Sequence, residues 1–120
     1  MTMKSNSTAT AYLRFLQLAR GIQQLPDAPQ FDANEKALLE EIALRWFENR
    51  TMTVREAIGL AHLGSPATLH KRITRLRQKD LLMTFNQTDD KRAKYLIPTE
   101  KTIAMFGDFG KKMNTVLAAT

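Results

Sequence analysis

The tripeptide Gly64-Ser65-Pro66 is the feature that most constrains the fold of this chain, because it combines a helix stop with a helix start. Glycine adopts the left-handed conformation that ends many helices at little cost. A serine side chain accepts from the free N–H groups of a following first turn, and proline at the first helical position removes no N–H that the helix needs. The sequence therefore predicts two helices that meet at a one- or two-residue corner, Gly64-Ser65.

The helix before this corner has its own start signal. Thr53 and Glu56 have the spacing of a capping box, and a brief extended segment, 51–53, leads into it. We expect the helix to end at Gly64. Its apolar spacing predicts a buried face formed by Val54, Ile58 and Ala61.

The helix after the corner, 66–79, repeats apolar residues at a spacing of four and seven. This pattern predicts that Leu69, Ile73 and Leu76 point inward. The polar side chains of the helix are then left to face water or a partner, and they are Thr68, His70, Lys71, Arg72 and Arg75.

A change of period follows this helix. The runs 81–85 and 94–97 are short and β-prone, and the polar stretch 86–93 separates them, which predicts a hairpin with a charged tip. Pro98 ends the second strand, and Thr99 is placed to cap a last helix.

Two helices are expected before the capping box. The first covers 8–24, with an apolar face that includes Tyr12 and Phe15, and the proline-containing run 25–29 ends it. The second begins at Asp32, where Glu35 completes a capping-box-like pattern, and it ends at Asn49-Arg50. We expect its buried stripe to consist of Leu38, Leu39, Ile42 and Trp46, and we interpret Trp46, Phe47 and Phe15 as core residues.

The last helix repeats apolar or small residues in a 3-4-3-4 rhythm, which is typical of a helix that packs along another helix. Gly107 and Gly110 weaken it by about 1 kcal/mol each relative to alanine. We therefore expect a close backbone approach or a bend near them. The seam residues are Ile103, Phe106, Gly110, Met113 and Leu117.

The predicted fold class is mainly α with a small β-hairpin, a winged helix-turn-helix flanked by N- and C-terminal helices. The 120 residues leave room for one domain with one core. We predict a disordered N-terminus over 1–7 and a single winged-helix domain over 8–120. Its parts are an N-terminal helix and linker at 8–31, the winged helix-turn-helix core at 32–98 and a C-terminal helix at 99–120.

The excess positive charge of the chain lies in its second half. Residues 1–64 carry seven Lys/Arg and seven Asp/Glu, whereas residues 65–98 carry eight bases and three acids. A neutral scaffold with one basic lobe suits a polyanion, because phosphates attract the lobe and counterion release supplies affinity. The charge distribution therefore favours a nucleic-acid partner.

A helix-turn-helix inserts its second helix into the major groove of DNA, and a wing reaches the flanking backbone or minor groove. Ser65 and Thr68 lie at the start of that helix, where they can bind phosphates or base edges. Lysine and arginine side chains further along reach phosphates or guanine edges, and Arg92 at the hairpin tip can enter a narrow minor groove. The predicted DNA-binding residues are Ser65, Pro66, Thr68, His70, Lys71, Arg72, Arg75, Lys91, Arg92 and Lys94.

The stretch 51–101 resembles the winged-helix domain of MarR-type bacterial transcriptional regulators. The resemblance lies in the segments 53–57, 65–76 and 79–82, in the wing segment 90–93, and in Pro98-Thr99-Glu100-Lys101, which is similar to the family's Leu-Thr-Glu-x helix start. It implies a recognition helix at 65–79, a wing at 86–94 with Arg92 as the wing arginine, and a pocket for a small-molecule effector that no residue of this sequence specifies.

The sequence also departs from the family pattern. Asp80 stands where the family usually has glycine, and Gln87-Thr88-Asp89 replaces the usual Asp-x-Arg of the wing, so the wing contact is expected to depend on Lys91 and Arg92. The chain is shorter at its C-terminus than typical members, which predicts that the full helical dimerisation lobe is absent or rearranged.

Several function classes are excluded. There is no cysteine, the two histidines lack the i, i+4 spacing of a helical metal pair, and there is neither a glycine-rich phosphate loop nor a paired-carboxylate motif. We therefore predict no catalytic residues, no metal and no cofactor. No apolar run approaches the roughly 20 residues that span a bilayer, and the N-terminus has no apolar signal region, which favours a cytoplasmic protein without membrane contact. The resemblance to MarR-type regulators implies a bacterial, nucleoid-associated protein.

The predicted function is sequence-specific binding of double-stranded DNA by a transcriptional regulator. A homodimer is expected, because the amphipathic segments 8–24 and 99–117 carry more apolar surface than a small central core absorbs. Two alternatives stay open. One is a winged-helix module that binds an acidic protein, and the other is a DNA-binding protein of plasmid replication or partition.

Overall fold

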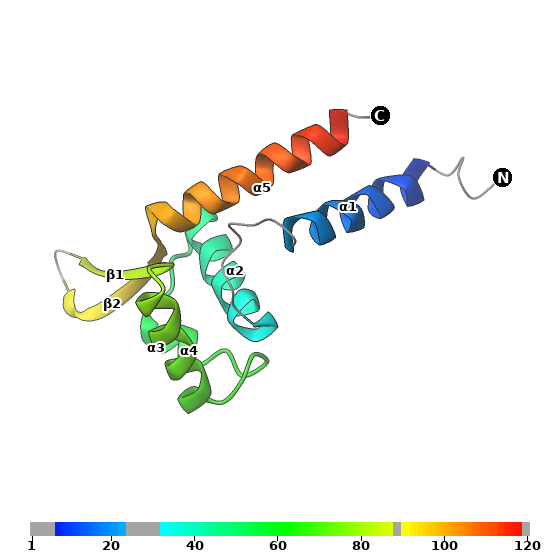
Figure 1. Ribbon diagram of the computed structural model, residues 1–120. Helices are drawn as coiled ribbons and strands as arrows, with labels where there is room; N and C mark the ends of the chain where they lie inside the picture. The colour runs from blue at the N-terminus through cyan, green and yellow to red at the C-terminus, as the bar shows by residue number, and fades with distance from the viewer. Residues whose placement is uncertain (1–6, 24–31, 88–89, 119–120) are drawn as a thin grey trace. The chain divides into compact units, whose positions relative to one another are not determined.

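The computed structural model describes residues 7–23, 32–87 and 90–118 (Figure 1). The chain divides into two compact units, one of residues 31–103 and one of residues 1–30 with 104–120, and each is described by itself. Of the N-terminus predicted as disordered, 1–7, residues 1–6 lie outside the described residues, whereas Ser7 is the first residue of α1 (Ser7–Gln23). Most of the predicted linker and the hairpin tip at 88–89 also lie outside the described residues. The prediction of one domain over 8–120 stays a prediction.

The unit of residues 31–103 is mostly helical with one two-stranded antiparallel hairpin, which confirms the predicted fold class. In Figure 1 the hairpin extends away from α2. In chain order the elements are α2 (Ala33–Phe47), α3 (Val54–Ile58), α4 (Pro66–Gln78), β1 (Leu82–Gln87), β2 (Asp90–Pro98) and the first turn of α5 (Glu100–Ala118).

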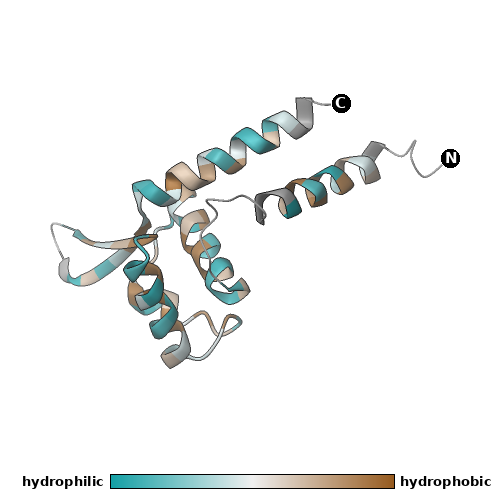
Figure 2. Cartoon of the chain, viewed as in Figure 1, coloured by the Kyte–Doolittle hydropathy of each residue, from teal (hydrophilic) through white to brown (hydrophobic). Residues whose placement is uncertain are grey.

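One apolar core holds this unit together. The inward face predicted for the helix after the corner is confirmed, because Leu69, Ile73 and Leu76 of α4 are all buried. Buried side chains of α2, of the 51–53 segment and of the hairpin pack with them. Each buried leucine stabilises the fold by about 1.5–3 kcal/mol relative to an exposed leucine. Figure 2 shows the same division along α2 and α4, where hydrophobic and hydrophilic residues alternate around each helix. The remaining core residues include Leu38, Leu39, Ile42, Met52, Leu81, Leu82 and Leu96.

The interpretation of three aromatic residues as core is wrong. Trp46 is 37% exposed, Phe47 is 76% exposed and Phe15 is 54% exposed. Trp46 follows Ile42 by four residues and shares its face, but it lies in the last turn of α2, beyond the covered middle of the helix. Phe47 follows the buried Ala43 by four residues and shares its face, but it is the last residue of α2 and lies beyond the covered part of the helix in the same way.

The two capping patterns fold differently. At α3, Thr53 Oγ1 accepts from the Glu56 backbone N–H and Glu56 Oε1 accepts from the Thr53 backbone N–H, so the predicted capping box is confirmed. At α2, Asp32 Oδ1 accepts from the Glu35 backbone N–H at 2.7 Å, which confirms the cap. The second half of that pattern is wrong, because the buried Glu35 carboxylate bonds Lys79 instead.

The helix before the corner is shorter than predicted. It ends at Ile58 with Gly59 as its cap, and the chain then follows tight turns through 59–64 instead of meeting α4 at Gly64-Ser65. The Gly59 and Leu60 N–H groups bond carbonyls three residues back, a tighter pattern than that of an α-helix. The predicted buried face is also wrong, since Ala57 and Leu60 are buried, Val54 and Ile58 are half-buried and Ala61 is exposed.

The start of α4 follows its prediction. Gly64 has a φ of 152°, which suits glycine, Ser65 is the N-cap and Pro66 occupies the first turn. The helix ends at Gln78, with Lys79 as its C-cap.

The strands of the hairpin run further than predicted. Pairing extends from Leu82 opposite Pro98 to Asn86 opposite Lys94, so part of the expected loop 86–93 is strand, and the register shifts only between Asn86 and Gln87. Phe85 and Tyr95 stack with ring centroids 5.5 Å apart, and this cross-strand pair stabilises the extension. The extended segment 51–53 is confirmed, because Thr53 bridges to Tyr95 on the other edge of β2.

The start of α5 is joined to the end of α4 by buried threonines. Thr99 Oγ1 accepts from the Thr102 N–H, as predicted for a cap, and donates to the Asp80 carbonyl at 2.7 Å. Thr102 is fully buried and its Oγ1 donates to the Leu81 carbonyl at 2.6 Å. Asp80 has a φ of 60°, the conformation that glycine adopts most easily.

The other unit contains α1 (Ser7–Gln23) and most of α5. The helix predicted over 8–24 is thus confirmed; Leu18 is buried, and Tyr12 and Leu13 are exposed. A Cβ added at Gly107 or Gly110 would meet nothing within 4 Å, so the close approach expected at these glycines is not found among the described residues.

Among the described residues, none of the helices combines the length and the apolar character that a membrane-spanning helix needs.

Candidate nucleic-acid interface

Helix α4 carries bases and no acids. Its thirteen residues include four bases, Lys71, Arg72, Arg75 and Arg77, and a fifth, Lys79, caps its C-terminus. The buried face is apolar, so the charge is distributed over the rest of the helix surface. Such a helix presents positive charge to any polyanion that approaches it.

The outermost face of α4 contains residues that the sequence interpretation missed. Ala67, Lys71, Thr74 and Gln78 are all exposed and recur at a spacing of four, three and four, opposite the buried face. Only Lys71 was among the predicted contacts. The helical period was a usable signal, but the prediction selected residues by their charge and their place in the first turn.

The first turn of α4 uses its hydroxyl groups internally. Ser65 Oγ accepts from the Thr68 backbone N–H at 3.3 Å and donates to Thr68 Oγ1 at 2.9 Å. Ser65 and Pro66 are exposed and Thr68 is half-buried. These predicted contacts therefore lie at the accessible end of the helix, and Pro66 contributes shape without a backbone donor.

Arg72 does not face water as expected. It is half-buried, and its Nη1 donates to the Leu63 carbonyl at 2.7 Å, across the turns that join α3 to α4. The same nitrogen lies 3.2 Å from the position that a Cβ would take at Gly64. Arg72 thus braces the corner before α4.

Two bases near the C-terminal end of α4, Arg75 and the C-cap residue Lys79, lie near a buried acid. Glu35 of α2 has a side chain that is 5% exposed, and its Oε2 lies 2.7 Å from Lys79 Nζ. Its Oε1 lies 3.7 Å from Nη1 of Arg75, whose side chain is 60% exposed. Arg75 can reach outward, whereas Lys79 fastens α4 to α2.

Two of the three bases predicted for the wing have side chains that the structure describes, and both are exposed. Arg92 and Lys94 are exposed on β2, although Arg92 lies within the strand and not at the tip. Asn86 Nδ2 donates to the Ala93 carbonyl at 2.9 Å, which orders this part of the hairpin. The Lys91 side chain lies outside the described residues.

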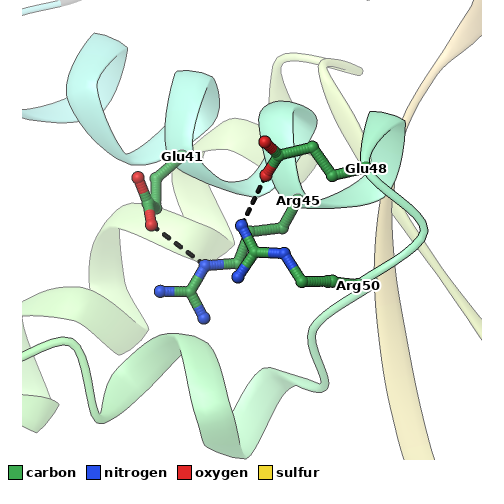
Figure 3. Close-up of polar contacts among 4 residues, drawn as sticks. All are labelled: Glu41, Arg45, Glu48 and Arg50. Carbon is green, nitrogen blue, oxygen red and sulfur yellow. Dashed lines mark hydrogen bonds and ion pairs between the residues drawn. The ribbon is translucent and has the colours of Figure 1, made fainter.

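The bases at the end of α2 are matched one to one by acids, whereas Arg75 and Lys79 share the single Glu35. Arg45 Nε lies 3.0 Å from Glu41 Oε1, and Arg50 pairs with Glu48 (Figure 3). Each pair cancels its own charge locally. The positive surface of this unit is therefore concentrated on α4 and the wing.

The described residues contain no group of three or more His, Asp or Glu side chains that could hold a metal ion. His62 and His70 are both exposed. His70 lies on α4 and stays a predicted DNA contact, whereas His62 lies in the turns before the corner.

Comparison with known proteins connects this arrangement to one group. No model of a protein family matches the sequence, and no curated protein sequence matches it. A MarR-like transcriptional regulator from Thermotoga maritima is 14% identical, with a TM-score of 0.66 over 93% of this chain and 76% of that chain. MepR from S. aureus is 15% identical, with a TM-score of 0.57 over 93% and 79% of the two chains.

ZitR from Lactococcus lactis, in a mutant form, is 18% identical to this chain, with a TM-score of 0.55 over 96% of this chain and 81% of that chain. The chain therefore has the winged-helix fold of MarR-type regulators, as the resemblance of 51–101 predicted.

Proposed function

We propose that this protein is a transcriptional regulator that binds double-stranded DNA. Helix α4 enters the major groove as the recognition helix, over 65–79, and the wing, over 86–94, lies on the flanking backbone or minor groove. The observation that carries the proposal is the acid-free surface of α4 beside an exposed Arg92 and Lys94. The regulator fold of the structural neighbours supports the same function.

The residues divide into four groups under this proposal. Lys71 and Arg75 contact phosphates or guanine edges, and Thr74 and Gln78, which share the outermost face of α4 with Lys71, face the floor of the groove. Ser65, Pro66, Thr68 and His70 contact DNA around the first turn of the helix. Arg72 holds the corner, and Lys91, Arg92 and Lys94 form the wing contact.

The protein acts as a homodimer in this proposal, and two recognition helices read two half-sites. The exposed apolar side chains of α1 and α5 support the dimer, because one chain leaves Tyr12, Leu13 and Met113 in contact with water. Its place is the bacterial cytoplasm, at the nucleoid. A small-molecule effector would act by changing the equilibrium between the free dimer and the DNA-bound dimer.

Fluorescence anisotropy with a random duplex of about 30 base pairs tests the DNA interface. We expect a log–log slope of affinity against salt of about −4 to −8 between 50 and 300 mM salt. Lys71→Ala and Arg92→Ala should each make the slope shallower by about one. Lys112→Ala is the matched control, because it removes the same charge from an exposed position on α5.

Two results would overturn the proposal. One is no binding at 50 mM salt, and the other is binding that ignores both interface substitutions. Either would favour the alternative module that binds an acidic protein. Plasmid replication or partition would give the same anisotropy as transcriptional regulation, and the effect of the protein on a reporter promoter separates them.

A further inference from the structure

A groove outside α4 lies between α3 and the wing. It has a volume of about 570 Å³ and is lined by seven residues, which define what we call the α3–wing groove. Four come from α3 and its N-cap, and three come from β2. They are Thr53, Val54, Arg55, Ile58, Arg92, Ala93 and Lys94.

The strand pairing explains why the groove exists. β2 pairs with β1 along one edge, while on its other edge the described residues provide only the bridge between Thr53 and Tyr95. Toward the wing tip, Lys94, Ala93 and Arg92 have α3 beside them instead of a strand. The groove is the space that opens there.

The lining of the groove is positive. It contains three bases, Arg55, Arg92 and Lys94, and no acid. The nearest acid in sequence, Glu56, is not among the lining residues, and its Oε1 accepts from both the backbone N–H and the hydroxyl of Thr53. The lining itself therefore contributes only positive charge to the groove.

The apolar residues of the lining indicate which kind of partner fits the groove. Val54, Ile58 and Ala93 lie among the bases, so the groove offers cations next to apolar surface. A nucleic-acid backbone matches this pattern, since it alternates phosphates with the apolar faces of its sugars. The groove also shares Arg92 and Lys94 with the proposed wing contact and so continues that interface.

We propose that the α3–wing groove holds a stretch of the DNA phosphate backbone, and that Arg55 of α3 is a DNA contact in addition to those on α4 and the wing. This inference rests on the proposed function. Arg55 anchors the backbone segment that passes between the recognition helix and the wing. It supplies sequence-independent affinity and fixes the angle at which the wing meets the duplex.

The test is the salt dependence of anisotropy for Arg55→Ala with the same random duplex. Loss of one phosphate contact should make the log–log slope shallower by about one and weaken binding roughly 3- to 10-fold near 100 mM salt. Arg55→Lys keeps the charge and should retain most of the slope. Lys112→Ala again controls for net charge, and thermal melting controls for folding, because the Arg55 side chain is exposed and its loss should leave the melting temperature unchanged.

A double substitution, Arg55→Ala with Lys94→Ala, adds a readout specific to the groove. If both bases hold the same backbone segment, the second substitution should cost less in the variant than in the wild type. If the two effects add without coupling and Arg55→Ala alone changes nothing, the groove is not a DNA site.

The failure of this inference is distinguishable from the failure of the proposed function. Wild-type binding that responds to Lys71→Ala but not to Arg55→Ala overturns only the groove. Absence of wild-type binding overturns both.

Discussion

Arg72 has a partner before any DNA is present, which separates it from its neighbour Lys71. Its guanidinium donates to the Leu63 carbonyl at 2.7 Å from a half-buried position, whereas Lys71 is exposed. A hydrogen bond from a charged group contributes more than a neutral one. Arg72 therefore acts on DNA binding through the geometry of the corner as well as through its charge.

We expect Arg72→Ala to lower the free energy of unfolding by about 1–2 kcal/mol, since the hydrogen bond to the corner is lost. Lys71→Ala, which removes the same charge from the next position, should stay within about 0.5 kcal/mol of the wild type. Urea denaturation followed by circular dichroism measures both. Equal stability of the two variants would show that Arg72 does not brace the corner.

Asp80 offers a second test at the scale of one residue. Its φ of 60° strains any side chain with a Cβ, although aspartate tolerates this region better than most residues. Asp80→Gly should stabilise the protein by up to about 1 kcal/mol, and Asp80→Ala should destabilise it by a similar amount. Thermal melting of the two variants is the measurement, and the same sign for both would contradict this account.

At the scale of elements, one partly buried ion pair ties α2 to the C-terminal end of α4. The Glu35 carboxylate is 5% exposed and accepts from Lys79 Nζ at 2.7 Å. Removal of one partner leaves a buried charge without its main compensation, which costs more than replacing both partners by apolar groups. The pair therefore constrains how the recognition helix sits on the scaffold.

We expect Lys79→Met to destabilise the protein by about 1–3 kcal/mol, because Glu35 then keeps only the more distant Arg75. Glu35→Met combined with Lys79→Met should recover part of that loss. Chemical denaturation of the two single variants and the double variant completes the cycle. Additive losses would mean that the two side chains do not interact.

Local signals were sufficient for much of the unit of residues 31–103. The caps at Asp32, Thr53 and Ser65 and the inward face of α4 depend on residues at most seven positions apart, so their pattern is visible in sequence. The end of α3 was not visible, because the turns of 59–64 are stabilised partly by Arg72 from the next helix. The partner of Glu35 is 44 positions away and could not be found by spacing.

The candidate site shows the same division. Charge and the helix start led to the α4 and wing residues, which sequence reveals directly. Arg55 was missed because it reaches the interface only through the bridge between Thr53 and Tyr95, a tertiary contact. Periodicity wrongly predicts a core position for Trp46, because it indicates the face of a helix but not how far along the helix the buried part extends.

At the scale of the whole molecule, the terminal helices carry apolar side chains that one chain leaves exposed. Tyr12 is 61% exposed on α1, and Ile103 and Met113 are 41% and 45% exposed on α5. Gly107 and Gly110 have open space where a Cβ would stand, so another helix could approach them closely. Scattered exposed apolar residues are normal, but a row at helical spacing favours a partner helix.

A second copy of the chain is the partner that the proposed function requires, since a dimer reads two half-sites. Sedimentation equilibrium at tens of micromolar should give twice the chain mass of 13.7 kDa. Met113→Glu places a charge in the seam and should shift the protein toward the monomer, because an unpaired charge is costly to bury. Thr115→Glu adds the same charge on the opposite, exposed side of α5 and should leave the dimer intact.

The monomer produced by Met113→Glu should also bind DNA more weakly than the Thr115→Glu protein at equal salt. A monomer mass for the wild type, or equal masses for the two variants, would show that the exposed seam of α5 does not join two chains.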